Sequence, residues 1–459
     1  MSLAIDAKVA AARAVAGLTR RAGRGGTSLP GKVLIRLDPR AITELSSRLD
    51  RGSVVVSATN GKTTTATMIA AVLERAGISL VHNRAGANMA GGVASALLAA
   101  SNGRGGIDAE LGLFEVDEFW LDRIVPQLQP RAILLGNLFR DQLDRYGELE
   151  AIADRWAATV SAAAPGTRLV LNADDPLVAD LGRRREGVTY FGVEDPAMAL
   201  PEMQHASDSK HCRRCGAAYA YEAVYLGHLG RYHCPRCEQR QPDSSVRAER
   251  ITLAGTRSAT FSMRTPQGEA EVRLPLPGLY NVYNALAASA LCLSLGIDLD
   301  EIAAALGGVK AAFGRAETVE VGPSTLSILL VKNPAGANEI LRTLALEPAQ
   351  LELLAVLNDR IADGRDVSWV WDADFELVAS RVRRVTCAGT RAAELALRLK
   401  YAGVPVERLE VVPRLPEALD RALSGDPPRL FVLPTYTALL ELQEELAGRG
   451  HLQGSWKRR

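Results

Sequence analysis

The residues with the clearest chemical meaning lie between positions 54 and 65, in the stretch VVVSATNGKTTT. A β-branched run there leads into a turn with Gly61, Lys62 and Thr63, after which apolar residues recur at helical spacing. Glycine lets backbone amides approach phosphate, lysine supplies a positive charge, and a hydroxyl at a helix N-terminus can ligate Mg²⁺. The pattern predicts a nucleoside triphosphate site, with a chance match in an ordinary loop as the competing interpretation. Val56 stands where the common pattern has glycine, which indicates a shortened variant of the loop.

Polar side chains follow three later predicted strands, at the points where those strands end. They are Glu115, Asp117 and Glu118 in FEVDE, Asn137, Asp141, Asp144 and Arg145 in GNLFRDQLDRYGE, and Asn172, Asp174 and Asp175 in LNADDP. Carboxylates at the carboxyl ends of parallel strands can face a bound nucleotide and hold Mg²⁺. Each residue alone is more often a solvated loop residue or a helix cap, but their recurrence favours a functional role.

Four of the six cysteines form two CxxC pairs. Cys212 and Cys215 are separated from Cys234 and Cys237 by 18 residues, a spacing typical of a zinc ribbon. Four thiolates would complete a tetrahedral shell, so we predict a structural Zn²⁺, with redox cysteines as the alternative. Zinc ribbons often contact nucleic acid, and nearby arginines would suit that role. Because no basic stripe extends beyond this segment, we expect a structural module or a partner surface.

The overall composition is that of an ordinary globular protein. The chain has 459 residues, 47% of them hydrophobic and 23% charged, and a net charge of +1. This balance gives no chain-wide electrostatic case for binding nucleic acid or acidic membranes. No apolar run approaches the ~18 residues of a membrane span, and the first residues lack the hydrophobic centre of a signal peptide. We expect a cytoplasmic protein without a transmembrane segment.

Strand-like runs alternate with helical patterns between residues 54 and 192, which predicts a mostly parallel, doubly wound α/β sheet. The cysteine-rich segment interrupts this region, and a second, Rossmann-like alternation follows. Its strands are expected near residues 326–331, 351–357, 384–387 and 430–433. We predict an N-terminal segment at 1–50 packed on a central ATP-binding domain at 51–314. The ribbon is inserted at 208–243, and a C-terminal α/β domain spans 315–459.

The phosphate loop and the motifs after it resemble the Mur ligase superfamily. The signature loop of that family is matched by Thr59, Asn60, Gly61, Lys62 and Thr63, followed by Thr64. Glu115 resembles the family's Mg²⁺-binding glutamate, Asn281 and Asn284 its asparagines, and Arg315 in FGRAE its hinge arginine. The resemblance implies a Mur ligase-type central domain. ATP would be held by the loop, the two asparagines and Arg315, and Mg²⁺ by Thr63 and Glu115, with Lys62 and Glu115 acting in catalysis.

Three departures indicate the branch of the superfamily. Gln142 stands where amino-acid-adding members have a Mg²⁺-binding histidine, and no lysine lies between Lys62 and Lys210 to be carbamylated, so a second metal site is in doubt. About fifty residues precede the loop, too few for a separate UDP-sugar-binding domain. The later stretches NPAGANE, LNDRIADGRDVSWVWDADFE and LPTYTALLELQ resemble the MurT-like members.

MurT-like proteins are ligase subunits of lipid II isoglutaminyl synthase. The resemblance implies that ATP phosphorylates the α-carboxyl of D-glutamate in the stem peptide of lipid II, and that ammonia converts the acyl phosphate to the amide. The ammonia would come from a GatD-like glutaminase in a heterodimer, acting at the inner face of the membrane. An aspartate of the C-terminal domain would complete the partner's catalytic triad. The sequence leaves Asp363 and Asp366 open, and we favour Asp366.

The cysteines of this chain also favour glutamine hydrolysis on a separate subunit. A glutaminase needs a nucleophilic cysteine, but four are assigned to zinc, and Cys292 and Cys387 lie in an apolar helix and strand. Two other functions stay open. A folylpolyglutamate synthase-like or cyanophycin-type ligase would add an amino acid and need no ammonia. A zinc-ribbon nucleic-acid-binding or scaffold protein would use ATP for regulation, but would give the acidic strand ends no purpose.

Overall fold

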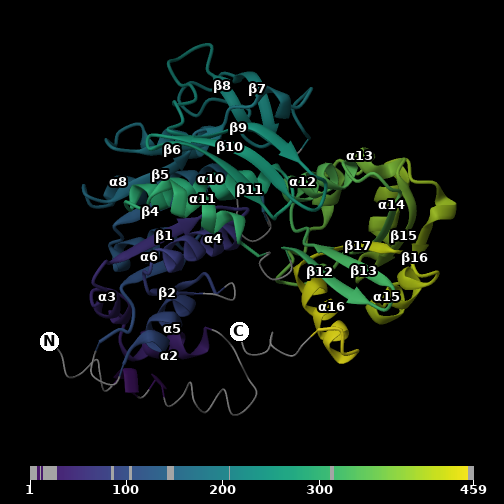
Figure 1. The fold of residues 1–459 in the computed structure, drawn as a ribbon, viewed down its shortest axis with the longest axis horizontal. Coiled ribbons are helices and arrows are strands. Elements are labelled where there is room, and N and C mark those ends of the chain that lie inside the picture. The colour runs from purple at the N-terminus through teal and green to yellow at the C-terminus, as the bar shows by residue number, and fades with distance from the viewer. Residues whose placement is uncertain are drawn as a thin grey trace.

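The computed structural model describes residues 8–10, 12–13, 28–83, 87–102, 106–141, 149–205, 207–310 and 315–452, the first two residues of the last range by their backbone alone. The strands of these residues form a nine-stranded sheet, a six-stranded sheet and a two-stranded hairpin. The nine-stranded sheet lies at the left in Figure 1, the hairpin at the top and the six-stranded sheet at the right. None of the described helices has both the length and the hydropathy to cross a bilayer.

The nine-stranded sheet confirms the predicted mostly parallel, doubly wound region. Its order is β11-β10-β9-β6-β5-β4-β1-β3-β2, parallel from β2 to β9 and antiparallel at the β9-β10-β11 edge. The strands are β1 Ser53–Ser57, β2 Leu80–His82, β3 Leu111–Glu115, β4 Ala132–Leu135, β5 Arg168–Asn172, β6 Thr189–Val193, β9 Val246–Leu253, β10 Ala259–Thr265 and β11 Gly268–Leu274. Because β1 lies between β3 and β4, the loops after these three strands meet at one edge.

Helices cover both faces of this sheet, as the burial of β1 shows. Val54 and Val56 pack into a core with helices α4, α10 and α11, whereas Val55 packs into a core with α3, α5, α6 and α8. Besides helical residues at 8–10 and 12–13, the described helices of this part of the chain are α2 Leu29–Leu37, α3 Ala41–Ser46, α4 Lys62–Arg75, α5 Ala90–Ala100, α6 Leu121–Leu128, α8 Leu149–Ala162, α9 Pro176–Ala179, α10 Leu279–Ser294 and α11 Leu299–Gly307, with short 3₁₀ helices η1 Asp180–Gly182 and η2 Pro196–Met198. Two buried faces explain why the central strands read as continuous apolar runs.

The cysteine-rich segment leaves the sheet after β6 and returns to it at β9. Its hairpin consists of β7 Ala220–Leu226 and β8 Leu229–His233. Phe191 of β6 pairs with Val246 of β9, so these two strands are neighbours in the sheet. The residues between them form a separate segment inserted between adjacent strands. The chain therefore holds an insertion where the sequence pattern broke.

The second alternation forms its own α/β layer structure. The strand order is β12-β13-β17-β14-β15-β16, with β12 antiparallel to β13 and the other pairs parallel. Its elements are β12 Arg315–Val321, β13 Ser324–Leu329, α12 Pro334–Ala345, β14 Leu351–Val356, η3 Ser368–Asp372, α13 Glu376–Ala379, β15 Val382–Ala388, α14 Ala392–Tyr401, η4 Val406–Arg408, β16 Leu409–Val411, α15 Leu415–Leu423, β17 Arg429–Pro434 and α16 Tyr436–Gly448. The four strands predicted here are β13, β14, β15 and β17, and β12 and β16 are additional. Below, this part is called the C-terminal unit.

Candidate functional site

The phosphate loop lies between β1 and the N-terminus of α4, as its sequence predicts. Gly61 is the N-cap of α4 and has a φ of 85°, a conformation that glycine adopts without strain. A Cβ on Gly61 would lie 2.0 Å from Oδ1 of Asn284, so a larger residue would collide with α10. Asn137, at the end of β4, fixes the loop: its side chain accepts from the amide of Asn60 at 2.9 Å and donates to the carbonyl of Asn60 at 3.0 Å.

Lys62 is buried and ion-paired within this loop. Its Nζ donates to Oε2 of Glu118 at 2.6 Å and to the carbonyl of Ala58 at 2.5 Å. Burial alone would lower the pKa of Lys62, but the negative charges of Glu118 and Asp117 keep that pKa above its ordinary value. Burial likewise opposes ionisation of Glu118, and the adjacent ammonium outweighs it, so the Glu118 pKa is lowered. Both groups are charged, and a phosphate at the loop would compete with Glu118 for Lys62.

Thr63 and Glu115 lie together at the carboxyl end of the sheet. The Thr63 hydroxyl donates to Oε1 of Glu115 at 3.1 Å. Asn83 holds the backbone at Glu115, because its side chain accepts from the Glu115 amide at 2.9 Å and donates to the Glu115 carbonyl at 2.7 Å. A hydroxyl and a carboxylate are hard oxygen donors, the type that Mg²⁺ prefers, so this pair fits a magnesium site.

The two asparagines of α10 approach the loop from the side. Asn284 accepts a hydrogen bond from the Thr65 hydroxyl at 3.2 Å and donates to Oδ1 of Asn281 at 3.0 Å. Asn281 in turn donates to the carbonyl of Pro277 at 2.7 Å. Both asparagines are buried and face a cavity of about 120 Å³.

That cavity lies between the phosphate loop, α10 and α12 of the C-terminal unit. Polar groups from Asn60, Thr64, Asn281 and Asn284 face it on one side. Its apolar wall is formed by Leu226, Leu229, Leu276, Tyr280, Leu329, Leu330 and Ile340. Leu226 and Leu229 flank the turn of the β7-β8 hairpin, so the insertion contributes part of this wall. A polar loop beside an apolar cavity suits a phosphate chain attached to a planar base.

The C-terminal unit contacts the phosphate loop directly. Lys332 Nζ donates to the carbonyl of Thr59 at 3.1 Å and to Oδ2 of Asp141 at 2.5 Å. Asn333 exchanges side-chain hydrogen bonds with Asn60 at 3.0 and 3.3 Å, and its Oδ1 caps α12 by accepting from the Gly336 amide at 2.9 Å. The sequence pattern did not assign a role to Lys332. The available signal was the Asn-Pro pair just after a predicted strand, which is typical of a helix start.

The LNADDP residues have structural roles, whereas their position after a strand predicts that they face a bound nucleotide. Asp175 caps α9 through the amides of Leu177 and Val178. Asp174 is fully buried and accepts hydrogen bonds from the Tyr283 hydroxyl at 2.6 Å and Gln241 at 2.5 Å. Burial raises the pKa of Asp174 to about 7. These carboxylates connect β5, the insertion and α10 rather than facing the cavity.

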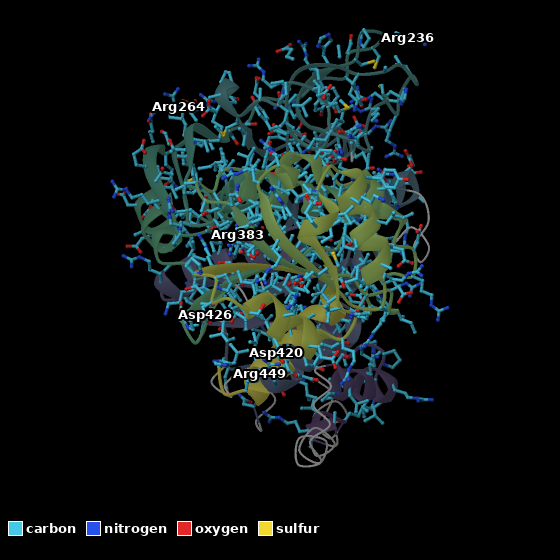
Figure 2. All side chains as sticks on the ribbon, turned by 90° about the vertical axis from the view of Figure 1, so that its right-hand side faces the viewer. Arg236, Arg264, Arg383, Asp420, Asp426 and Arg449 are labelled. Atoms are coloured by element: carbon cyan, nitrogen blue, oxygen red, sulfur yellow. The ribbon has the colours of Figure 1, made fainter. Side chains whose placement is uncertain are left out.

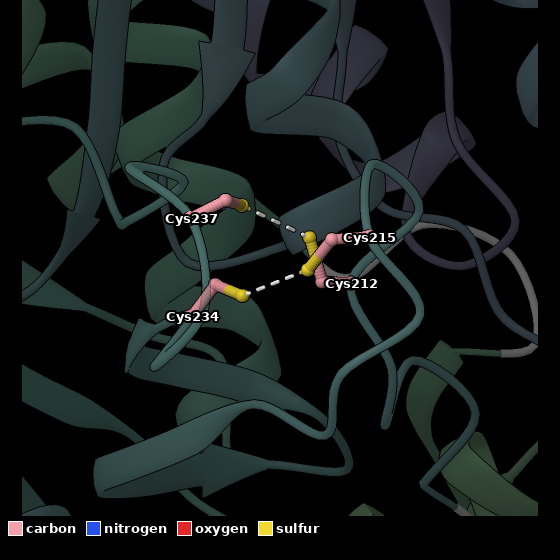
Figure 3. A group of neighbouring side chains, drawn as sticks. All are labelled: Cys212, Cys215, Cys234 and Cys237. Atoms are coloured by element: carbon pink, nitrogen blue, oxygen red, sulfur yellow. Dashed lines mark hydrogen bonds between the residues drawn. The ribbon is translucent and has the colours of Figure 1, made fainter.

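The four cysteines of the insertion converge at one point (Figure 3). Their sulfur atoms all lie within 4.8 Å of one another, and the Cys212–Cys237 and Cys215–Cys234 separations are 3.5 and 3.4 Å. These separations exceed the ~2.05 Å of a disulfide bond. A tetrahedron with zinc–sulfur bonds of about 2.3 Å has edges of about 3.8 Å, so the arrangement fits a Zn²⁺ ion.

Arginines of the insertion are engaged in ion pairs with the central sheet's helices. Arg213 pairs with Asp154 of α8, and Arg214 Nε donates to Asp180 of η1 at 3.1 Å. Arg236, in contrast, lies at the outer end of the insertion (Figure 2). On the C-terminal unit, Figure 2 shows Asp420 and Asp426 among Arg383 and Arg449. This mixture of signs differs from the basic stripe of a nucleic-acid surface.

The two candidate aspartates of the C-terminal unit have different environments. Asp363 is buried, and it accepts from the amide of Thr437 at 2.8 Å and from the Thr437 hydroxyl at 2.5 Å, at the first turn of α16. Asp366 is exposed, and its contact is with the Ser368 amide at 2.8 Å. Hydrogen bonds from Ser368 lower the pKa of Asp366. Asp363 therefore stabilises the first turn of α16, whereas Asp366 faces solvent as a carboxylate.

Several residues named from the sequence lie outside the described residues or are described only in part. They are Gln142, Asp144 and Arg145, the FGRAE residues 313 and 314, and the side chain of Arg315. The structure brings together Thr59, Asn60, Gly61, Lys62, Thr63, Thr64, Glu115, Asn281 and Asn284 at one site. The cysteine cluster and the two aspartates form separate regions.

Comparisons with known proteins agree with this arrangement. Residues 56–234 match a family model described as the Mur ligase middle domain, and residues 330–439 match one described as MurT ligase C-terminal. The chain is 33% identical, over 94% of each sequence, to the lipid II isoglutaminyl synthase (glutamine-hydrolyzing) subunit MurT of Streptococcus pneumoniae. The corresponding subunit of Staphylococcus aureus strain N315 is 31% identical over 93% of this chain and 94% of its own. This chain belongs to the MurT family of Mur ligases.

Solved structures support the same fold for this MurT-family ligase. A pseudomurein peptide ligase type C from Methanothermus fervidus superposes with a TM-score of 0.68 at 24% identity, covering 88% of this chain and 80% of that protein. Folylpolyglutamate synthase from Mycobacterium tuberculosis superposes with a TM-score of 0.60 at 16% identity, covering 89% and 95%. At such identities the similarity establishes the Mur ligase-type α/β fold and leaves the substrate open.

Proposed function

We propose that this chain is the ATP-dependent ligase subunit that converts the α-carboxyl of D-glutamate in the lipid II stem peptide to the amide. The observation that carries the proposal is the full-length similarity to two subunits named for lipid II isoglutaminyl synthase. The phosphate-loop geometry supports it, because a buried lysine, a hydroxyl and a carboxylate meet beside a cavity. The reaction would take place in the cytoplasm, where this chain meets lipid II at the inner face of the membrane.

The chemistry follows from the charges at the loop. ATP would place its base in the cavity near Asn281 and Asn284 and its phosphates at the N-terminus of α4. Lys62 would exchange Glu118 for a phosphate oxygen, and Thr63 with Glu115 would hold Mg²⁺, which neutralises charge on the phosphates. The substrate carboxylate takes up the γ-phosphoryl group and releases ADP. Ammonia then attacks the acyl carbon, phosphate leaves, and a proton is lost from nitrogen to give the amide.

Ammonia must come from elsewhere, because the chain's cysteines are unsuited to glutamine hydrolysis. All six lie within the described residues, and four of them form the zinc-type cluster. Burial raises the pKa of Cys292 and raises that of Cys387 to about 12, so both stay protonated thiols at neutral pH. We propose a GatD-like glutaminase as the partner in a heterodimer. The cluster would hold a structural Zn²⁺.

Asp366, rather than Asp363, is the residue we propose to complete the partner's triad. It is an exposed carboxylate, and large apolar side chains are exposed on neighbouring segments, Ile361 at 67% and Trp371 at 49%. Such a surface suits a protein partner. Asp366→Asn should lower glutaminase activity of the complex about 100-fold or more while leaving ammonia-driven ligation intact. Asp363→Asn should instead reduce stability, since asparagine keeps one of the two oxygens that accept from the amide and hydroxyl of Thr437. Equal glutaminase activity in Asp366→Asn and the parent would reject this role.

The amidation itself is tested by co-expressing the chain with a GatD-like partner and supplying ATP, glutamine and lipid II. Mass spectrometry with fragmentation should show one carboxylate changed to an amide at the α-carboxyl of D-glutamate. Lys62→Met is the inactive control. A product extended by a free amino acid would instead support a folylpolyglutamate synthase-like or cyanophycin-type ligase. Retention on single-stranded DNA at about 0.15 M salt, without ligation, would support the nucleic-acid alternative.

A further inference from the structure

Lys332 is a charged residue of the candidate site that the proposed chemistry has not used. It comes from the C-terminal unit, yet its ammonium group lies on the phosphate loop, 3.1 Å from the carbonyl oxygen of Thr59. Lys62 Nζ lies 3.5 Å from the same oxygen. Since both nitrogen atoms lie this close to one oxygen, the two positive charges are at most about 7 Å apart.

Two ammonium groups at this separation are suited to one phosphoryl group between them. Each can donate a charge-assisted hydrogen bond to a different oxygen of the same phosphate, and such bonds are among the strongest in proteins. In the structure each lysine forms an ion pair with one carboxylate, Lys62 with Glu118 and Lys332 with Asp141. A triphosphate at the loop would compete with both carboxylates in the same way.

We infer that Lys332 is a second phosphate-contacting lysine, which the C-terminal unit brings to the γ-phosphate of ATP when it closes on the phosphate loop. This inference rests on the proposed function for the presence of ATP. It adds a specific consequence: the site that stabilises the transferring phosphoryl group is complete only when residues of both units meet.

The contacts around Lys332 indicate that its ammonium group is positioned for a ligand and is not part of an ordinary surface ion pair. Its partner Asp141 is largely buried, with a side-chain exposure of 11%, and Oδ1 of that carboxylate has no hydrogen-bond partner among the described residues. Asn333, the next residue, bonds to Asn60 in the loop and starts α12. Asn333 therefore fixes the position of Lys332 relative to the phosphate loop.

The test compares the affinities of a triphosphate and a diphosphate in the full-length chain. Lys332→Met should weaken binding of a non-hydrolysable ATP analogue about 10- to 100-fold, the loss expected for one hydrogen bond to a charged group. ADP affinity should change far less, because the inferred contact is with the γ-phosphate. Lys332→Arg retains the charge and should recover part of the affinity. Lys400→Met removes an exposed lysine of α14 and serves as the matched control.

Each outcome is decisive for this inference independently of the amidation reaction. A selective loss of triphosphate affinity, with ADP affinity and melting temperature unchanged, supports it. An equal loss for both nucleotides with a lowered melting temperature would make Lys332 a brace between the units and overturn the inference, as would unchanged affinities. If the parent binds the ATP analogue but forms no amide, the proposed function fails while the affinity comparison still stands.

Discussion

The phosphate-loop site and the cysteine cluster both concentrate charged or ionisable groups, but they are built in opposite ways. At the loop, Lys62 is paired with Glu118 and Lys332 with Asp141, beside a cavity of about 120 Å³. In the insertion, four sulfur atoms lie within 4.8 Å of one another, close enough for one Zn²⁺ to be bound by all four. The first arrangement has partners that can be exchanged for a substrate. The second has the geometry of a closed structural site.

The two regions are nevertheless connected through the insertion. Leu226 and Leu229, which flank the turn of the β7-β8 hairpin, form part of the cavity wall. Gln241 of the insertion donates a hydrogen bond to Asp174, which also accepts one from Tyr283 of α10. We therefore propose that catalysis takes place at the phosphate loop and that the insertion supports the cavity. Variants in each region separate these roles.

The largest effect is expected from Lys62→Met. Loss of the charge that stabilises the transferring phosphoryl group should lower kcat about 10³-fold. It also leaves Glu118 buried without its partner, which should cost about 3–5 kcal/mol of unfolding free energy. The double variant with Glu118→Gln should recover much of the stability and none of the activity, as measured by urea unfolding and ADP release. Recovery of activity in the double variant would contradict the assigned role of Lys62.

The cysteine cluster should affect stability and ATP affinity rather than the chemical step. Cys215→Ser should abolish stoichiometric zinc binding and lower the unfolding free energy by on the order of 4 kcal/mol. Because the hairpin lines the cavity, the Kd for ATP should rise between about 2- and 30-fold, with kcat at saturating ATP nearly unchanged. Metal analysis, calorimetric unfolding and nucleotide titration measure these effects. A large fall in kcat with normal ATP affinity would instead place the cluster in the chemistry.

Glu115→Gln should weaken Mg²⁺ binding while leaving the loop folded. The amide retains the shape of the side chain and can still meet the Thr63 hydroxyl, but it has lost the negative charge. The Mg²⁺ concentration for half-maximal activity should rise at least about tenfold. A Mg²⁺ titration at fixed ATP measures this shift. An unchanged midpoint would remove Glu115 from the metal site.

The smallest effect on activity is expected at Asp174, for which the prediction concerns the pH dependence of stability. Burial raises the pKa of Asp174 to about 7 from an ordinary value of 3.8, so the folded state binds this proton more tightly than the unfolded state. The contribution to stability is present below about pH 4 and is lost as the pH rises through about 7. Asp174→Asn lacks this titration, so its stability relative to the parent should increase between pH 4 and 7. A difference independent of pH in urea unfolding would contradict this assignment.

The local parts of this picture could be predicted from the sequence, because neighbouring residues determine them. The loop at Gly61, the parallel strands on either side of it and the CxxC pairs each depend on short-range patterns, and the structure has them where the patterns indicated. The broken alternation also coincides with the segment that leaves the sheet between β6 and β9. The domain boundaries themselves stay a prediction.

Contacts between distant segments could not be predicted in this way. Nothing near Glu118 in the sequence shows that it pairs with Lys62 instead of ligating metal, and Lys332 reaches Thr59 only because two separate units meet. Asp174 and Asp175 have the same residue type and strand-end position as Glu115, but burial gives them structural partners. The sequence likewise left Asp363 and Asp366 open, with Asp366 favoured, and the contact of Asp363 with Thr437 lies too far along the chain to be predicted.

We propose that the phosphate-loop site activates a carboxylate for attack by ammonia. The most direct measurement supplies the full-length chain with ATP, Mg²⁺, lipid II and ammonium chloride, without any partner, and counts ADP and amide together. We expect one ADP for each amide formed at the α-carboxyl of D-glutamate, with neither product when lipid II is omitted. ADP formation that is indifferent to ammonium but requires a free amino acid would contradict it.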